Sequence, residues 1–160
     1  MVWTVAEVPV TETYPLRRGL LRGDRPDLDL HLPDDDIPGA FHLAARDDAG
    51  AIVGVASVMP GAPEFAAPLP SWRLRQMAVA ADAQGSGAGT ALFEAVLTRL
   101  RVRDAASLWA ESRDSSLGFY LARGMRVVPG RRHTVGTVAY TDVVLALPAV
   151  GLKGEKVIRV

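Results

Sequence analysis

The clearest chemical signal in the chain is the run of alternating glycines in QGSGAGTAL, residues 84–92. A chain keeps several side-chain-free positions together where the backbone must turn sharply or where another molecule must come close. The apolar residues that follow predict a helix, and the amides at a helix N-terminus form a ready site for an anionic phosphate. The stretch therefore predicts an anion-binding loop, with glycines that serve only tight packing as the alternative.

Two common phosphate-binding patterns do not fit this loop. A P-loop requires a lysine after its last glycine, whereas Gly89 is followed by Thr90. A dinucleotide-binding fingerprint requires a glycine at its sixth position, which is Thr90 counted from Gly85 and Leu92 counted from Gly87. The wider context of the loop is therefore needed to name its ligand.

That context, QMAVAADAQGSGAGTAL at 76–92, resembles the acetyl-CoA signature of the GCN5-related N-acetyltransferase (GNAT) superfamily. The signature reads Gln/Arg-x-x-Gly-x-Gly/Ala, and Gln84, Gly87 and Gly89 fill its three positions. A second segment, GFYLARGM at 118–125, is similar to the family's Phe-Tyr-x-x-x-Gly-Phe, with a methionine for the usual last Phe. Together they identify the chain as a member over about residues 72–128.

The resemblance implies that acetyl-CoA is the co-substrate and that its pyrophosphate lies in the glycine loop. It also implies a backbone N–H near the end of the preceding strand that polarises the thioester carbonyl. Arg113 stands where many members have an Asn that contacts the pantetheine arm, so it either pairs with a phosphate or is a solvated loop charge. The implied binding residues are Met77, Ala78, Val79, Gln84, Gly85, Ser86, Gly87, Ala88, Gly89, Thr90 and Arg113.

The activity that the resemblance implies is direct transfer of the acetyl group to an amine, without a covalent enzyme intermediate. Tyr120 occupies the position of the family's usual general acid. A phenol with a pKa of ~10 can protonate a thiolate whose conjugate acid has a pKa of ~8.5. The alternative is a tyrosine that packs its ring in an amphipathic helix with its hydroxyl at the surface.

The base that takes a proton from the acceptor ammonium is less clear. Glu111 follows the apolar strand SLWA, so we expect it at the C-terminal mouth of that strand. There it could act through water, bind the ammonium, or be a solvated strand-end acid. His42 and His31 are further candidates, each with a structural role as its alternative.

The segment at 23–39 is rich in aspartates, and in this family it commonly borders the acceptor site. Such a negative field would attract a cationic acceptor such as a polyamine, an aminoglycoside-like amine, an amino-acid derivative or a lysine-containing peptide. A solvated loop that keeps the protein soluble is the alternative. The aspartates are Asp24, Asp27, Asp29, Asp34, Asp35 and Asp36.

These observations favour an acetyl-CoA-dependent N-acetyltransferase of a small cationic amine. One alternative is a protein or peptide N-acetyltransferase, which would need an open groove. Another is a non-catalytic regulatory domain that binds acyl-CoA, against which the intact Tyr120 argues. We expect no metal cofactor. The final strand could pair with that of a second copy, so both a monomer and a homodimer are compatible with the sequence.

The amino-acid composition limits which partners and which chemistry are possible. The chain has 160 residues, which predicts a single domain over 1–160, and 18 basic residues balance 18 acidic ones. The zero net charge gives no argument for nucleic acid or a membrane surface as partner. The absence of cysteine excludes disulfides, thiolate metal sites and a cysteine nucleophile. The chain shows no signal-peptide pattern and no apolar window of eighteen residues, so we expect a soluble cytoplasmic protein.

The elements expected along the chain give an α/β (α+β) fold whose central sheet is mixed and mostly antiparallel, with one parallel strand pair and flanking helices. The resemblance implies the GNAT arrangement, in which that parallel pair is splayed. We expect a bulge in the strand before the glycine loop, because its apolar residues do not alternate. The predicted strands are 2–10, 41–46, 51–59, 72–79, 106–110, 125–130 and 134–148, with the tail 149–160 left open as an additional strand. The predicted helices are 16–22, 89–103 and 115–124.

Overall fold

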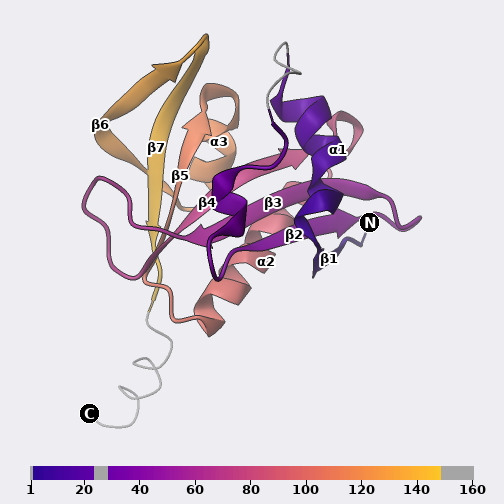
Figure 1. Ribbon diagram of the computed structural model, residues 1–160, viewed down its shortest axis with the longest axis horizontal. Coiled ribbons are helices and arrows are strands. Elements are labelled where there is room, and N and C mark those ends of the chain that lie inside the picture. The colour runs from indigo at the N-terminus through magenta and orange to yellow at the C-terminus, as the bar shows by residue number, and fades with distance from the viewer. Residues whose placement is uncertain (1, 24–28, 149–160) are drawn as a thin grey trace, which may run out of the picture. The chain divides into compact units, whose positions relative to one another are not determined.

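A seven-stranded mixed sheet, with strands in the order β1-β2-β3-β4-β5-β7-β6, forms the framework of this protein (Figure 1). The computed structural model describes residues 2–23 and 29–148, so the strand suggested for 149–160 lies outside the described residues. The strands are β1 (Thr4–Glu7), β2 (Phe41–Arg46), β3 (Ile52–Pro60), β4 (Ser71–Val79), β5 (Ser107–Arg113), β6 (Arg126–Val135) and β7 (Val138–Ala146). The α-helices are α1 (Tyr14–Leu16), which continues as a π-helical turn over Arg17–Leu21, α2 (Ala88–Val102) and α3 (Asp114–Ala122).

The pairing confirms the predicted fold class. The pairs β1–β2, β2–β3, β5–β7 and β6–β7 are antiparallel, whereas β4 and β5 are parallel. The parallel register joins Ser71–Arg73 to Ser107–Trp109, which are the first three residues of each strand. A parallel pair requires a crossover connection, and here the crossover contains α2.

The described chain consists of two compact units. Among the described residues, unit 1 comprises 2–23, 29–60 and 74–100, and unit 2 comprises 61–73 and 101–148. Strand β4 begins in unit 2 and ends in unit 1.

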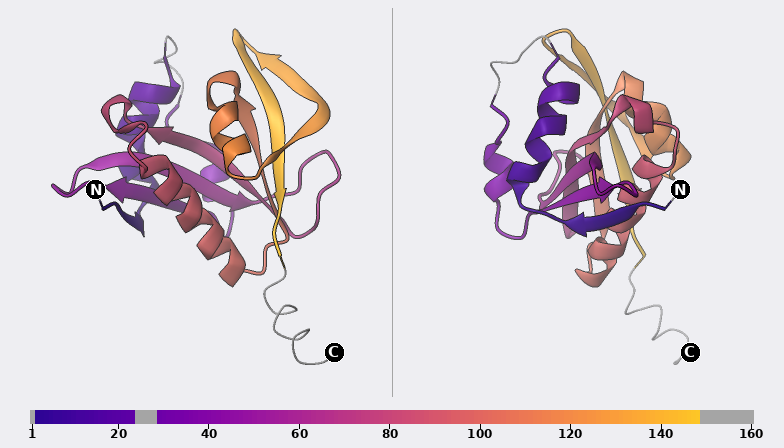
Figure 2. Two further views of the ribbon diagram at one scale, coloured as in Figure 1. Left: turned by 180° about the vertical axis from the view of Figure 1, so that it is seen from behind. Right: turned by 90° about the vertical axis from the view of Figure 1, so that its right-hand side faces the viewer.

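In unit 1, helical segments cover both faces of the strands (Figure 2). On one face, leucines of the first helical segment pack against a buried cluster of Ala44, Val55 and Ala78. On the other face, α2 buries its apolar side chains, and a Cβ built on Gly54 of β3 would lie 2.7 Å from Leu92 Cδ1. The glycine at position 54 therefore lets α2 approach the sheet closely.

Strand β4 is continuous but contains a backbone irregularity, as the sequence predicts. Gln76 has φ +51°, in the left-handed region that non-glycine residues rarely adopt. Its side-chain Oε1 accepts a hydrogen bond of 3.1 Å from Arg22, a buried residue that also donates to the carbonyl oxygen of Asp29. These contacts hold the irregular point of β4 against the segment that follows the first helix.

In unit 2, β5 pairs along its whole length with β7, and β6 pairs with β7 as a hairpin. The turn lies at Gly136–Thr137, so the predicted single strand over 134–148 was wrong: β6 runs to Val135 and β7 starts at Val138. Gly136 has φ +62°, which a two-residue hairpin turn requires and which marks the turn inside that range.

The ends of other elements also differ from those predicted. The strand expected over 2–10 is limited to Thr4–Glu7, because Pro9 precedes a 3-10 turn at Val10–Thr13. Helix α3 starts at Asp114, one residue before the predicted start, with Arg113 in the capping position. Gly124 ends α3 with φ +95°, as predicted. Within residues 2–23 and 29–148, no helix has the length and hydropathy to cross a membrane.

Candidate active site

The glycine loop of unit 1 lies between the end of β4 and the start of α2. Gly85 and Gly87 have φ +78° and +101°, so both adopt a conformation that only glycine takes readily. Gln84 donates a hydrogen bond of 2.9 Å from Nε2 to the carbonyl oxygen of Val79, and Trp3 donates one of 3.3 Å to the carbonyl oxygen of Ser86. The loop is therefore fixed both to the strand that precedes it and to the N-terminal segment.

This loop has the features of a phosphate cradle. Residues Gln84–Gly87 are exposed, and helix α2 begins directly after them at the buried Ala88. The amides of a first helical turn have no carbonyl inside the helix to bond, and the helix dipole makes that end positive. A Cβ built on Gly87 would lie 3.5 Å from the indole nitrogen of Trp3. The residues present thus fit a phosphate group that approaches the backbone closely.

The other residues implied in acetyl-CoA binding also lie around this loop or in unit 2. Met77, Ala78 and Val79 form the end of β4, and Gly89 and Thr90 lie in the first turn of α2. All of these belong to unit 1. Arg113 belongs to unit 2, where it is the last residue of β5 and the residue that precedes α3.

Tyr120 lies on α3 in unit 2 and is buried, with 7% of its surface exposed. Most of the Tyr120 side chain is therefore packed inside unit 2. Burial raises the pKa of Tyr120 to about 12, because the charged phenolate would be poorly solvated there. The hydroxyl consequently keeps its proton across the physiological range and can act as a hydrogen-bond and proton donor.

Glu111 lies within β5 and not at the end of that strand, which corrects the sequence-based position. The strand continues through Arg113. Its buried residues Leu108, Ala110 and Ser112 alternate with partly exposed residues that point to the other face, namely Trp109, Glu111 and Arg113. Glu111 is directly opposite Asp142 of β7. Its side chain remains 31% exposed, so the carboxylate is accessible from solvent.

Each carboxylate oxygen of Glu111 has a partner. Arg73 donates to Oε1, and His133 Nε2 lies 2.8 Å from Oε2. The Arg73 guanidinium also stacks over Trp109, with 4.7 Å between the guanidinium carbon and the ring centre. His133 of β6 is a residue that the sequence analysis missed, since GRRHTV at 130–135 carries no motif and only the strand pairing brings it to Glu111.

Asp142 completes this polar cluster of unit 2. Its side chain is 1% exposed, and its Oδ2 accepts a hydrogen bond of 2.8 Å from Nε of Arg131. Its Oδ1 is buried without a hydrogen-bond partner among the residues that the structure describes. One ligand atom each from Glu111, His133 and Asp142 lie within 4.8 Å of one another. We call these three residues the Glu-His-Asp cluster.

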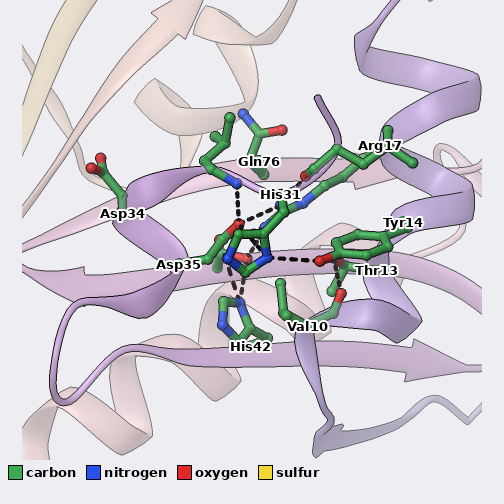
Figure 3. Close-up of polar contacts among 12 residues, drawn as sticks. Val10, Thr13, Tyr14, Arg17, His31, Asp34, Asp35, His42 and Gln76 are labelled. Carbon is green, nitrogen blue, oxygen red and sulfur yellow. Dashed lines mark hydrogen bonds and ion pairs between the residues drawn. The ribbon is translucent and has the colours of Figure 1, made fainter. Parts of the chain in front are cut away.

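A second polar network lies in unit 1 and is buried (Figure 3). Arg17 is fully buried and donates two hydrogen bonds to the carboxylate of Asp35, at 2.7 and 2.8 Å, and one of 2.8 Å to Ser57 Oγ. Asp35 also accepts a hydrogen bond from the backbone N–H of Leu32, and His42 Nδ1 lies 2.7 Å from Ser57 Oγ. This network ties the segment around Asp35 to β2 and β3.

Three of the four aspartates that the structure describes in the predicted acidic loop are paired within the protein. Asp35 is held by Arg17, Asp34 by Arg75 at 2.7 Å, and Asp36 by His31 at 2.8 Å. Asp24 and Asp27 lie outside the described residues. The three paired carboxylates therefore support the alternative of a structural loop more than an open negative field. His31 and His42 both lie in this part of unit 1, in structural contacts.

Lowering the pH from 7 to 5 is expected to reduce the free energy of unfolding through His42. Burial lowers the pKa of His42 below its ordinary value of 6.5, and this outweighs the opposite effect of the Asp35 charge. The unfolded chain therefore takes up this proton at a higher pH than the folded chain, so stability falls as the pH drops below 6.5. Urea unfolding at several pH values measures the slope, which His42→Asn should flatten; an unchanged slope would contradict the assignment.

A further loss of stability is expected at lower pH through Asp35. Burial by itself would raise the pKa of Asp35, but the hydrogen bonds from Arg17 and Leu32 and the Arg17 charge lower it below its ordinary value of 3.8. The contribution of the ionised carboxylate is complete above pH 3.8 and is lost as the pH falls through the folded-state pKa. Protonation of His42 below pH 6.5 and of Asp35 below pH 3.8 therefore both reduce the free energy of unfolding.

Comparison with known proteins places the chain in a family. The profile of the acetyltransferase (GNAT) family matches residues 10–125. The uncharacterized N-acetyltransferase YitI of Bacillus subtilis (strain 168) is 25% identical over 122 residues, which cover 76% of this chain and 81% of that protein. The chain therefore belongs to the acetyltransferase (GNAT) family, and with it to the acetyl-CoA-dependent acyltransferases.

Solved structures agree in fold. A GNAT-family acetyltransferase from Staphylococcus aureus Mu50 superposes with a TM-score of 0.71 at 14% identity, over 92% of this chain and all of the other. A phosphinothricin acetyltransferase from Sinorhizobium meliloti, in complex with AcCoA, gives a TM-score of 0.72 at 15% identity, over 92% of this chain and 89% of the other. At these identities the likeness concerns the fold.

Proposed function

We propose that this protein transfers the acetyl group of acetyl-CoA to the primary amine of a small molecule that is cationic at pH 7. The observation that carries the proposal is the glycine loop at residues 84–87, held between a strand end and the N-terminus of α2 in the arrangement that suits a pyrophosphate. Family membership over residues 10–125 supports the same donor.

The proposed reaction assigns one proton donor to the chain. Acetyl-CoA, when bound, supplies the activated acetyl group. The free amine attacks the thioester carbonyl carbon, so that a C–N bond forms and the C–S bond breaks. Tyr120 gives its hydroxyl proton to the departing sulfur, the new amide nitrogen loses its extra proton, and Tyr120 is reprotonated from solvent. Counted from the ammonium form of the acceptor, one proton is released per turnover.

The roles of the two implied charged residues follow from their surroundings. Glu111 is partly exposed and shared between Arg73 and His133, so we propose that it helps to deprotonate the acceptor through a neighbouring group. Arg113, at the junction of β5 and α3, is proposed to contact the donor in place of the family's Asn.

Replacing Tyr120 with Phe is expected to lower kcat by roughly 10²–10⁴-fold, the usual contribution of a positioned general acid, while acetyl-CoA affinity changes little. Because the pKa of Tyr120 is raised to about 12, its loss should not be mimicked by raising the pH to 9 in the wild-type protein. Tyr14→Phe, which removes a hydroxyl bonded to His31 in unit 1, is the matched control. Equal turnover in Tyr120→Phe and wild type would mean that another group protonates the sulfur.

The acceptor class is tested by thiol release from acetyl-CoA in the presence of single amines. We would use spermidine, kanamycin, lysine and a lysine-containing peptide, and the protein adds no thiol of its own because it has no cysteine. Faster release with the small amines supports the proposal, and faster release with the peptide supports a peptide acetyltransferase. Binding of acetyl-CoA without release with any amine would instead favour a regulatory acyl-CoA-binding domain.

A further inference from the structure

We infer that His133 is the base that removes a proton from the acceptor ammonium, and that Glu111 is the residue that positions it. The inference rests on the proposed function and concerns the Glu-His-Asp cluster of unit 2. It changes the role expected for Glu111 from that of the base itself to that of the group that orients the base.

The register of the strands brings the side chains of the cluster to one face. Tyr140 and Asp142 are two residues apart on β7, so they point to the same side of the sheet. Glu111 is directly opposite Asp142, and His133 is directly opposite Tyr140. His133 stacks on the Tyr140 ring with 5.6 Å between centroids and 18° between planes, which fixes the plane of the imidazole.

The contact with Glu111 decides which ring nitrogen can accept a proton. An ionised carboxylate can only accept hydrogen bonds, so Nε2 of His133, 2.8 Å from Oε2, must carry the hydrogen. In the neutral ring the lone pair then lies on Nδ1. Nδ1 makes no hydrogen bond to any residue that the structure describes, and the side chain is 35% exposed. His133 is therefore a solvent-accessible base with a defined tautomer.

The charges around the ring suit a group that must gain and lose a proton. The charged residues on the packed strands β4, β5, β6 and β7 near the ring are Glu111, Arg73, Asp142, Arg126, Arg131, Arg132 and Arg113, which is opposite Tyr140. Asp114 of α3 pairs with Arg132, and Glu64 on the loop before β4 pairs with Arg131. Glu111 is neutralised by Arg73, and Asp142 by Arg131. The charges of both carboxylates in the cluster are therefore balanced by guanidinium groups, and the Tyr140 ring stacks on the imidazole.

The same three side chains have the spacing of metal ligands, but their partners favour proton transfer. Arg73 and Arg131 already provide two positive charges to the two carboxylates. A divalent cation would have to bind beside both guanidinium groups and displace the hydrogen bond between His133 and Glu111. A proton on Nδ1 requires no such rearrangement.

In the proposed step, the acceptor R–NH₃⁺ gives one proton to Nδ1 of His133 and becomes R–NH₂, whose nitrogen then forms the C–N bond. The imidazolium keeps its Nε2–H bonded to Glu111 and returns the proton from Nδ1 to solvent. Glu111 does not touch the reacting atoms. Its carboxylate holds the tautomer that leaves Nδ1 available.

The first test is the pH dependence of thiol release with the amine that wild-type protein acetylates fastest among spermidine, kanamycin, lysine and the peptide. His133→Asn is expected to lower kcat by about 10²-fold or more and to abolish the decline of kcat/KM toward acid pH, while the KM for acetyl-CoA stays within a few-fold. His31→Asn is the matched control, because it removes an imidazole of unit 1. Added imidazole should partly restore a His133→Ala variant.

The second test does not depend on activity. The chain has three histidines, so ¹⁵N NMR of histidine-labelled protein can assign each ring with the His133→Asn and His31→Asn variants. We expect the Nε2–H tautomer for His133 in wild type and a mixture of tautomers in Glu111→Gln, together with a lower kcat at unchanged KM.

The outcomes separate the inference from the function on which it rests. An active His133→Asn variant with the wild-type pH profile, or an Nδ1–H tautomer in the wild type, overturns the role of His133 and leaves the acetyltransferase proposal intact. Zn²⁺ that raises the Tm of wild type but not of His133→Asn overturns it in favour of a metal site. A wild-type protein that does not bind acetyl-CoA overturns the proposed function first, and the tautomer measurement then reports only the geometry of the pair.

Discussion

A Gly87→Glu protein is expected to lose affinity for acetyl-CoA on the order of 100-fold or more while remaining folded. Gly87 has φ +101° at the exposed loop before α2, where the proposed pyrophosphate would approach the backbone. A glutamate there adds bulk and a negative charge to the site of an anion, and juxtaposed like charges cost several kcal/mol. Calorimetric titration with acetyl-CoA measures the loss directly.

Two controls separate the causes of this loss. Gly50→Glu places the same side chain at another glycine of unit 1 with positive φ, +85°, in the turn between β2 and β3, so it bears similar backbone strain without touching the loop. Gly87→Gln keeps the bulk and removes the charge. We expect wild-type affinity for Gly50→Glu and an intermediate loss for Gly87→Gln. If folded Gly87→Glu binds acetyl-CoA like wild type, the phosphate site has been assigned to the wrong loop.

Arg17→Met is expected to destabilise the fold by about 3–5 kcal/mol, because it leaves the Asp35 carboxylate buried without its partner. The two side chains are 0% and 1% exposed, so water cannot replace the lost guanidinium. The carbonyl oxygen of Leu30 and the hydroxyl of Ser57 also lose a donor. For a chain of this size, the loss corresponds to a fall in Tm of roughly 6–20 °C.

An exposed ion pair of the same unit provides the comparison. Arg46 binds Glu12 at 2.9 Å, with side chains 36% and 41% exposed, and Arg46→Met should cost less than about 1 kcal/mol. The double variant Arg17→Met/Asp35→Leu should recover part of the stability, since the unpaired buried charge is gone. Urea unfolding at pH 7 measures all three variants. A cost below about 1 kcal/mol for Arg17→Met alone would show that water or another group reaches Asp35.

Local sequence signals were sufficient for much of the fold and for the glycine loop. The stripe of α2 and the hairpin of β2 and β3 are short-range patterns, and they lie within a residue or two of their predicted places. Gly124 ends α3 for a reason that is visible in the sequence, namely the left-handed conformation of a helix end.

The Glu-His-Asp cluster could not be predicted in this way. Glu111 and His133 are far apart in sequence and lie on strands that are separated by β7, so their contact depends on the β5-β7-β6 strand order. The predicted ends of β5 and β6 were too early for the same reason. Polar residues that alternate along a strand resemble a loop when the strand pairing is unknown. The buried ion pair between Arg17 and Asp35 could not be predicted for a related reason. Asp35 is one of several aspartates in a loop, and only its packing distinguishes it from the others.

The measurement that tests the central claim most directly is thermal unfolding of the wild-type protein with and without excess acetyl-CoA. A ligand at about 100 times its Kd adds roughly 2.7 kcal/mol to the stability of the folded state. For a chain of this length, each ~1 kcal/mol raises Tm by about 2–4 °C. We therefore predict an upward shift of several degrees. An unchanged Tm in folded protein at millimolar acetyl-CoA would contradict the proposal that the glycine loop binds this donor.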